Sequence, residues 1–264
     1  MTAADTTMTA PAEVPDEWDF YLTRIDDTAA SFFLNFWYRS HAPLPGVDTL
    51  YRCDLQMLEP GAHGLGEADD AERLQQVEER IAEAAAEHGL YFVGRIRWNG
   101  TWLLRLFGPP DLTETLRVIA AKAVAGKPSR KFDVDSTTDP EWSHYYDFLC
   151  PDDERMQWIE DRHVVESLME HGDPLTRPRR VDHWIYFEVA SKRDAFVRAA
   201  ANDGYEMESA HEDATSELKY CAQLHRVDSV ELEEIHDVVM SLMELAEEHD
   251  GEYDGWETSV ERDK

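Results

Sequence analysis

The sequence predicts an α+β protein with two domains, each an antiparallel sheet with helices packed on one face. The chain has 264 residues, which is enough for two ordinary domains. Hydrophobic residues make up 42% of it and aromatic residues 11%, so most of the chain can bury a core although 31% of the residues are charged. The expected strands and helices also follow the order βαββαβ twice along the chain, which predicts two similar domains.

The first domain is expected at residues 16–140, after a polar tail at residues 1–15 that has no periodic pattern. Two aromatic and β-branched runs, at 18–25 and 30–38, flank Asp26 and Asp27 and predict a hairpin. The βαββαβ order then comprises a strand at 50–58, a helix at 67–88, strands at 91–98 and 101–107 around the turn Asn99-Gly100, a helix from Pro109 to Ala125, and a strand at 131–135.

The second domain is expected at residues 145–260 and begins with an extra helix at 152–171. Its βαββαβ order comprises a strand at 181–189, a helix at 192–201, strands at 205–211 and 218–227, a helix that Asp228 and Glu231 begin and Gly251 ends, and a strand at 252–260. That last helix carries an apolar stripe of Ile235, Val238, Val239, Leu242 and Leu245. We therefore expect two ferredoxin-like plaits, the first with an extra N-terminal hairpin and the second with an extra leading helix.

The strand at 181–189 alternates in a way that assigns its two faces. Its odd-numbered residues, Val181, His183, Ile185, Phe187 and Val189, are expected to meet the helices. Trp184 and Tyr186 then lie on the face that a plait leaves uncovered, where large apolar groups usually mark an interface. We expect them to be buried against the other domain, and an external partner is the alternative.

The net charge of −31 is the most unusual property of the chain. Residues 141–264 hold 33 acidic and 12 basic side chains, so the second half is the more acidic. Such a surface repels phosphates, which argues against direct binding of RNA or DNA and favours a basic protein partner. Only six lysines stand against nineteen arginines, and adaptation to a salt-rich cytosol explains the acidity equally well.

No membrane segment or leader is expected, because no apolar run approaches roughly 18 residues and the N-terminus has no basic start before an apolar stretch. Cys53, Cys150 and Cys221 are odd in number and lack metal-binding spacing, so they suit a reducing compartment and a place in the core. The sequence therefore indicates a cytoplasmic protein.

No common phosphate-binding, dinucleotide-binding, hydrolase or zinc motif is present. Two Glu-x-x-His pairs lie on expected helices, Glu160/His163 and Glu233/His236, but a chain so rich in Glu and His has such pairs by chance. We therefore expect no catalytic residue, no metal and no cofactor. A basic run of Arg177, Arg179 and Arg180 is expected to pair with surrounding carboxylates.

Three stretches of the second half carry a family likeness: Arg179-Arg-Val-Asp-His-Trp-Ile-Tyr-Phe187, Arg193-Asp-Ala-Phe196 with Asp203-Gly-Tyr205, and Tyr253-Asp-Gly-Trp-Glu-Thr258. Together they resemble the family called regulator of ribonuclease E activity B. The first half, which begins Trp18-Asp-Phe-Tyr21, resembles domain of unknown function family 695. The first resemblance implies a small acidic protein, not an enzyme, which binds the basic, largely disordered region of an endoribonuclease and restrains RNA cleavage.

The expected function is therefore that of a regulator that binds a basic segment of an RNA-processing enzyme. A metal-dependent hydrolase whose site forms only in the fold, and an acidic solubility or stress protein without a specific partner, are the alternatives. The candidate interaction residues are Trp184, Tyr186, Trp256, Glu231, Glu234, Glu244, Glu247 and Glu248.

Overall fold

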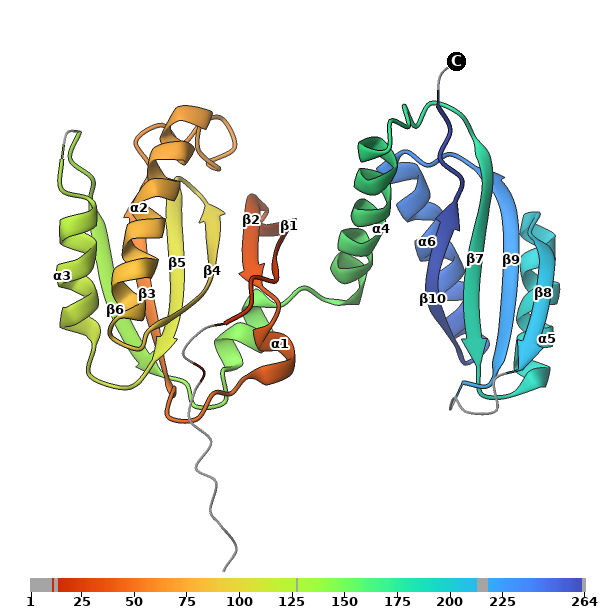
Figure 1. Cartoon of the computed structure of the whole chain (residues 1–264), viewed down its shortest axis with the longest axis horizontal. Helices are drawn as coiled ribbons and strands as arrows, with labels where there is room; N and C mark the ends of the chain where they lie inside the picture. Colours follow the sequence, from red (N-terminus) through yellow and green to blue (C-terminus); the bar gives the residue numbers. More distant parts are fainter. Residues whose placement is uncertain (1–10, 12–13, 127, 213–217, 263–264) are drawn as a thin grey trace, which may run out of the picture. The chain divides into compact units, whose positions relative to one another are not determined.

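The computed structural model describes residues 11, 14–126, 128–212 and 218–262, and the chain divides into two compact units, Met1–Asp152 and Asp153–Lys264. Each unit contains one antiparallel sheet, of six strands in the first and four in the second, so the α+β class is confirmed (Figure 1). Residues 1–10 and 12–13 of the expected tail lie outside the described residues.

The first unit consists of β1 (Trp18–Ile25), β2 (Thr28–Asn35), α1 (Tyr38–His41), β3 (Thr49–Gln56), α2 (Ala68–Ala86), β4 (Tyr91–Trp98), β5 (Thr101–Gly108), α3 (Thr113–Ala123) and β6 (Phe132–Thr138). Its strands lie in the order β1-β2-β4-β5-β3-β6. Both central residues of its two tight hairpins have positive φ, 46° and 61° at Asp26 and Asp27 and 48° and 75° at Asn99 and Gly100. These angles are typical of two-residue hairpin turns, for which Asn-Gly is the preferred sequence.

Helices α2 and α3 cover one face of the first sheet, where Leu74, Ile81 and Leu116 share a core with inward residues of β3 and β5. The opposite face is covered by a π-helix, η1 (His144–Leu149), that the sequence patterns did not predict. Tyr145 Oη donates to the Asn35 carbonyl at 2.8 Å, and Tyr21 Oη to the Leu149 carbonyl at 2.8 Å. Residues 145–152 therefore belong to the first unit, and not to the second domain as expected.

The second unit consists of α4 (Asp153–Glu170), β7 (Arg179–Phe187), α5 (Ala190–Ala200), a 3₁₀ turn at Ala201–Asp203, β8 (Glu206–Glu212), β9 (Tyr220–Asp228), α6 (Leu232–Glu247) and β10 (Gly251–Thr258). Its strands lie in the order β10-β7-β9-β8. Ile185 and Phe187 are fully buried with Leu242 on the helix side, whereas Trp184 and Tyr186 are half-buried on the other side. The predicted register of this strand is thus correct.

Three local predictions in the second unit are wrong. Val189 is 48% exposed, because β7 ends at Phe187 and Val189 is the N-cap of α5. Asp228 does not begin α6, since it ends β9 and accepts hydrogen bonds from Arg226. Gly251 does not end α6, since the helix ends at Glu247, Asp250 takes the positive φ of 55°, and Gly251 begins β10.

All three cysteines are free thiols, with Cys53 and Cys221 buried and Cys150 half-buried. Burial raises the pKa of the Cys53 thiol to about 12, so this group stays protonated. Within the described residues, no helix is both long and apolar enough to cross a membrane.

Candidate functional site

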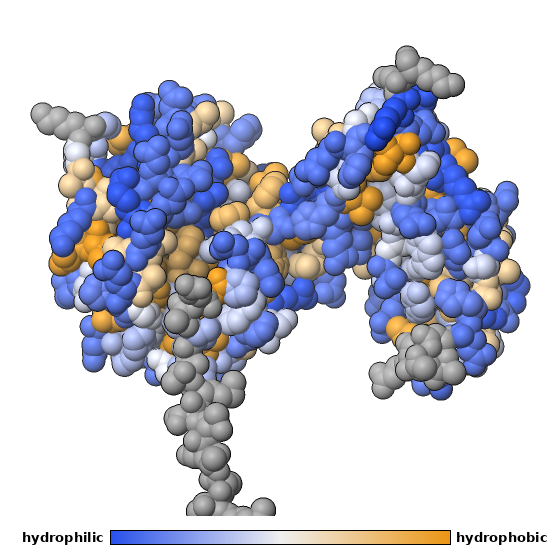
Figure 2. Space-filling view, viewed as in Figure 1, coloured by the Kyte–Doolittle hydropathy of each residue, from blue (hydrophilic) through white to orange (hydrophobic). Residues whose placement is uncertain are grey.

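Helix α6 presents its carboxylates to solvent because one stripe of its apolar residues packs against the sheet. Ile235, Val239, Leu242 and Ala246 recur at helical spacing and are buried against the sheet. The five glutamates singled out in the sequence are exposed: Glu231, Glu234, Glu244, Glu247 and Glu248. This side of the second unit is therefore strongly acidic. Figure 2 shows that hydrophilic residues predominate on the surface of each unit in that view.

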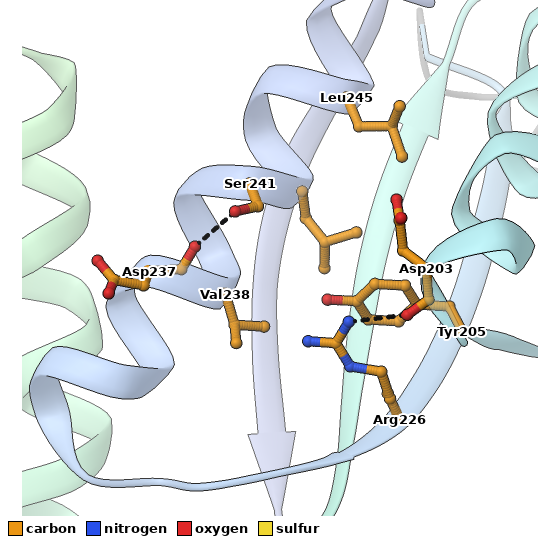
Figure 3. A pocket seen from close by; sticks show the side chains of 8 residues that line it. Asp203, Tyr205, Arg226, Asp237, Val238, Ser241 and Leu245 are labelled. Carbon is orange, nitrogen blue, oxygen red and sulfur yellow. Dashed lines mark hydrogen bonds between the residues drawn. The ribbon is translucent and has the colours of Figure 1, made fainter.

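A groove of about 440 Å³ runs along the acidic helix, which we call the α6 groove (Figure 3). It is lined by Asp237, Val238, Ser241, Leu242 and Leu245 of α6, and by Asp203, Tyr205 and Arg226 from the segment before β8 and from β9.

Arg226 and Tyr205 pack against each other where they line the groove. The guanidinium carbon of Arg226 lies 4.2 Å from the centre of the Tyr205 ring. Its Nη1 donates to the Asp203 carbonyl at 3.0 Å (Figure 3), and its Nε and Nη2 donate to the Asp228 carboxylate at 2.8 to 3.0 Å. Burial raises the pKa of Tyr205 to about 12, so its hydroxyl is neutral. The Asp228 carboxylate thus neutralises the positive charge of Arg226.

The groove combines apolar side chains with a carboxylate rim. Val238, Leu242 and Leu245 supply the apolar part, and Figure 3 shows the Asp203 side chain pointing into the space between Tyr205 and Leu245. Ser241 Oγ donates to the Asp237 carbonyl at 2.8 Å, so the proton of this hydroxyl is used in a hydrogen bond within α6. Such a groove suits a side chain with an aliphatic stem and a cationic head.

Three of the exposed glutamates extend this rim along the helix. Glu234 lies one turn before Val238, Glu244 three residues after Ser241, and Glu248 three residues after Leu245. Residues three or four apart are neighbours on a helix surface, so these carboxylates border the groove along its length. Three of the predicted glutamates therefore lie on the same side of α6 as its groove-lining residues.

Trp256 was predicted as an interaction residue, and this is wrong, because it is only 7% exposed and lies in a core cluster with Val239. Its indole Nε1 donates to Asp161 Oδ1 at 2.9 Å. A bulge between Tyr253 and Gly255 explains the error, since it turns both Tyr253 and Trp256 toward the helices.

Trp184 and Tyr186 are not brought together with the α6 glutamates. Helices α5 and α6 cover one face of the second sheet (Figure 1). Trp184 and Tyr186 point to the opposite face, because they alternate with the buried Ile185 and Phe187. The predicted interaction residues therefore divide between two opposite sides of the second unit.

The histidine of the Glu233/His236 pair on α6 contacts a neighbouring helix. His236 Nδ1 lies 2.8 Å from Asp161 Oδ2, and Asp161 is fully buried, so this pair joins α6 to α4. The part of the chain that the structure describes contains no group of three or more His, Cys, Asp or Glu side chains suited to a metal ion. The arginine run pairs internally, Arg179 with Asp173 and Arg180 with Asp182 and Glu208.

The sequence patterns missed Asp203, Tyr205 and Arg226 as parts of one site. The signal was present in β9, where Arg226 occupies an inward position in line with Ala222 and Leu224. A charged residue at an inward strand position needs a buried partner, and this one has Asp228 and the Tyr205 ring.

Two family models match the chain. One, described as Regulator of ribonuclease activity B, matches residues 158–258, and the other, described as a family of unknown function, DUF695, matches residues 16–150. No curated protein matches the chain.

Two solved structures show a distant likeness. One, of a protein provisionally assigned as a glycine cleavage system transcriptional repressor, has 12% identity and a TM-score of 0.23, and the match covers 81% of this chain and 99% of that one. The other, an unknown protein from Galdieria sulphuraria, has 9% identity and a TM-score of 0.22, with 79% and 96% covered. At TM-scores this low neither likeness indicates a function.

The DUF695 match covers half of the chain and contains all strands and helices of the first unit, but its description states no activity. The other match runs from α4 to β10 and names regulators rather than enzymes. The chain therefore belongs to the DUF695 family through residues 16–150 and continues, at residues 158–258, as a Regulator of ribonuclease activity B domain.

Proposed function

We propose that this chain is a non-catalytic, cytoplasmic regulator that binds a basic segment of a ribonuclease E-like endoribonuclease and inhibits or tunes RNA cleavage by protein contact. The observation that carries the proposal is the α6 groove, which combines apolar side chains with carboxylates. The groove lies in the domain that matches the family of ribonuclease regulators. The contacts are assigned to the rim of this groove and to Glu231, Glu234, Glu244, Glu247 and Glu248.

Charge alone gives weak binding, because a solvent-exposed ion pair contributes only about 0.2 to 1 kcal/mol. The groove adds a second contribution. An arginine or lysine can lay its stem on Val238 and Leu245 and place its cationic head beside Asp203. Several such residues on a flexible segment give affinity, while the carboxylates orient and attract it.

Regulation follows from competition. Basic segments of RNA-processing enzymes are the parts that contact RNA phosphates. A segment held along α6 cannot hold RNA at the same time, and the acidity of residues 141–264 repels the RNA itself. The proposal therefore requires no chemistry from this chain.

The test is an RNA-cleavage assay with a purified ribonuclease E-like enzyme and increasing amounts of the full chain. We expect the intact chain to reduce the rate of RNA cleavage. The triple change Glu234→Lys, Glu244→Lys, Glu248→Lys should lower this inhibitory potency at least tenfold. The matched control reverses three exposed glutamates of the first unit, Glu72, Glu83 and Glu87, and should keep full potency. Equal loss in both triple variants would show that only net charge matters, as for an acidic solubility protein, and would refute the proposal.

We also propose that both units are ferredoxin-like plaits. The β3-α2-β4-β5-α3-β6 segment places its strands in the order β6-β3-β5-β4, and the second unit places its strands in the order β10-β7-β9-β8. In both units the last strand of the βαββαβ segment lies at one edge, followed by the first, the third and the second. The β1–β2 hairpin then extends the first plait at its β4 edge, and α4 is the extra leading helix of the second.

A further inference from the structure

The side of the second sheet opposite α5 and α6 has an aromatic centre and acidic borders. Residues paired directly across neighbouring strands point to the same face. Trp184 pairs with Gln223 of β9 and Gly255 of β10, and Tyr186 pairs with Glu252. We call Trp184, Tyr186, Gln223, Glu252, Gly255 and Glu257 the outer sheet face.

On the β10 side of Trp184, the outer sheet face has a position that no side chain fills. The residue at this position, Gly255, has no side chain, and a Cβ added to it would meet no atom within 4 Å. On the β9 side, Gln223 Oε1 accepts from Ser209 Oγ at 3.0 Å and its Nε2 donates to Asp182 at 3.4 Å. The polar groups beside the indole are thus tied to one another, and the space above Gly255 is open in the described part of this unit.

The charged side chains of β10 beside this space are acidic. Glu252 and Glu257 are exposed and flank Gly255 on β10. Arg180, at the edge of the same face, already pairs its guanidinium with carboxylates of this face. Its Nε and Nη2 donate to Asp182 at 2.9 and 2.6 Å, and Nη2 also donates to Glu208 at 2.9 Å. A second arginine from outside would find the same kind of partner.

We propose that the outer sheet face is a second docking surface, which takes an arginine of an extended segment of a partner protein. Its guanidinium lies flat on Trp184 above Gly255, with Glu252 and Glu257 as counter-charges. Indole is the best ring for such stacking, and the planar guanidinium stacks better than the ammonium of lysine. Partially exposed Trp and Tyr are also the side chains on which binding energy concentrates at interfaces.

This surface is distinct from the α6 groove, because the two lie on opposite faces of one sheet. The inference does not rest on the identity of the ribonuclease or on binding at α6. It adds that the second unit offers two sites, so that one basic chain wraps around a sheet edge or two segments bind together.

The test titrates the full chain with a synthetic peptide of alternating arginine and glycine, and with its lysine counterpart, while following the indole N–H signals by NMR. Trp184→Phe assigns the Trp184 signal. We expect this signal to shift on saturation with the arginine peptide, and the lysine peptide to bind there at least threefold more weakly. Calorimetry should count one peptide fewer per chain in Trp184→Ala than in the unaltered chain.

The triple lysine variant of α6 separates this inference from the proposed function. If it retains one peptide and the Trp184 shift, the outer sheet face is a site whatever happens at the groove. If it loses all binding while Trp184→Ala binds normally, the inference is wrong and the proposed function stands. An unmoved Trp184 signal at saturation would also overturn the inference, and this titration is made on the unaltered chain.

Discussion

Trp256 and Asp161 lie 95 residues apart in the sequence and are joined by a hydrogen bond of 2.9 Å from the indole Nε1 to Oδ1. Gln157 Nε2 donates to the same oxygen at 2.9 Å, and His236 Nδ1 lies 2.8 Å from Oδ2. One fully buried carboxylate thus joins α4, α6 and β10. It attaches the extra leading helix to the rest of the second unit.

We expect Asp161→Ala to lower the free energy of unfolding of the second unit by about 3 kcal/mol. The change leaves several buried donors without a partner, and each costs about 1 to 3 kcal/mol. Urea unfolding with hydrogen exchange resolved by peptide measures each unit separately. Glu170→Ala, at an exposed position of the same helix, should change stability by less than about 0.5 kcal/mol. A loss equal to that of Glu170→Ala would contradict the role of Asp161.

Acid should destabilise both units between about pH 6.5 and about pH 4. Burial lowers the pKa of His183 in the second unit and of His144 in the first from 6.5 to about 4. As pH falls through this window the unfolded chain binds protons that the folded chain does not, so the free energy of unfolding decreases.

Each histidine contributes at most about 1.4 kcal/mol per pH unit. His183→Gln should flatten the pH dependence of the second unit and leave that of the first unchanged, as measured by urea unfolding at several pH values. An unchanged slope in the second unit would show that His183 is not the group responsible.

Gly251→Ala should destabilise the second unit by about 2 to 3 kcal/mol. A Cβ at this position would lie 2.2 Å from the ring of buried Phe187, and overpacking of this kind costs about 1 to 3 kcal/mol. Gly172→Ala is the matched control, because its φ is +85° and a Cβ there meets no atom within 4 Å. Gly172→Ala should lower the free energy of unfolding by only about 1 to 2 kcal/mol, which is the cost of placing alanine in a left-handed backbone conformation. Thermal unfolding of both variants compares the two effects, and a smaller loss in Gly251→Ala would be inconsistent with this packing.

The α6 groove should show separable charge and apolar contributions to partner binding. Glu234→Gln and Glu248→Gln are expected to reduce the salt dependence of the association constant, because fewer ions pair across the interface. Leu245→Ser should weaken binding about tenfold and leave the salt dependence unchanged, because it removes only apolar contact. Association measured by calorimetry at three salt concentrations distinguishes the two. A changed salt dependence in Leu245→Ser would mean that the groove is not the contact surface.

Local patterns predicted most of the elements, because each depends on residues close in sequence. The Asn99-Gly100 turn has the positive φ angles that these residues favour, and α2 ends before Gly89 at φ +76°. The run of aromatic residues from His144 to Leu149 has no helical or strand period, and its π-helix forms through distant partners such as the Asn35 carbonyl. No local pattern could have placed it.

The sequence by itself determined the two-domain α+β organisation, the register of β7, and the surplus of carboxylates that α6 exposes, since periodicity and composition decide these. Only the tertiary structure decided which candidates share a surface. A single bulge in β10 buried Trp256, and the sheet separated Trp184 from the α6 glutamates. The α6 groove exists because strand pairing brings Tyr205 and Arg226 beside residues of a helix that follows them in the chain. Such meetings depend on long-range packing, which no short window of sequence contains.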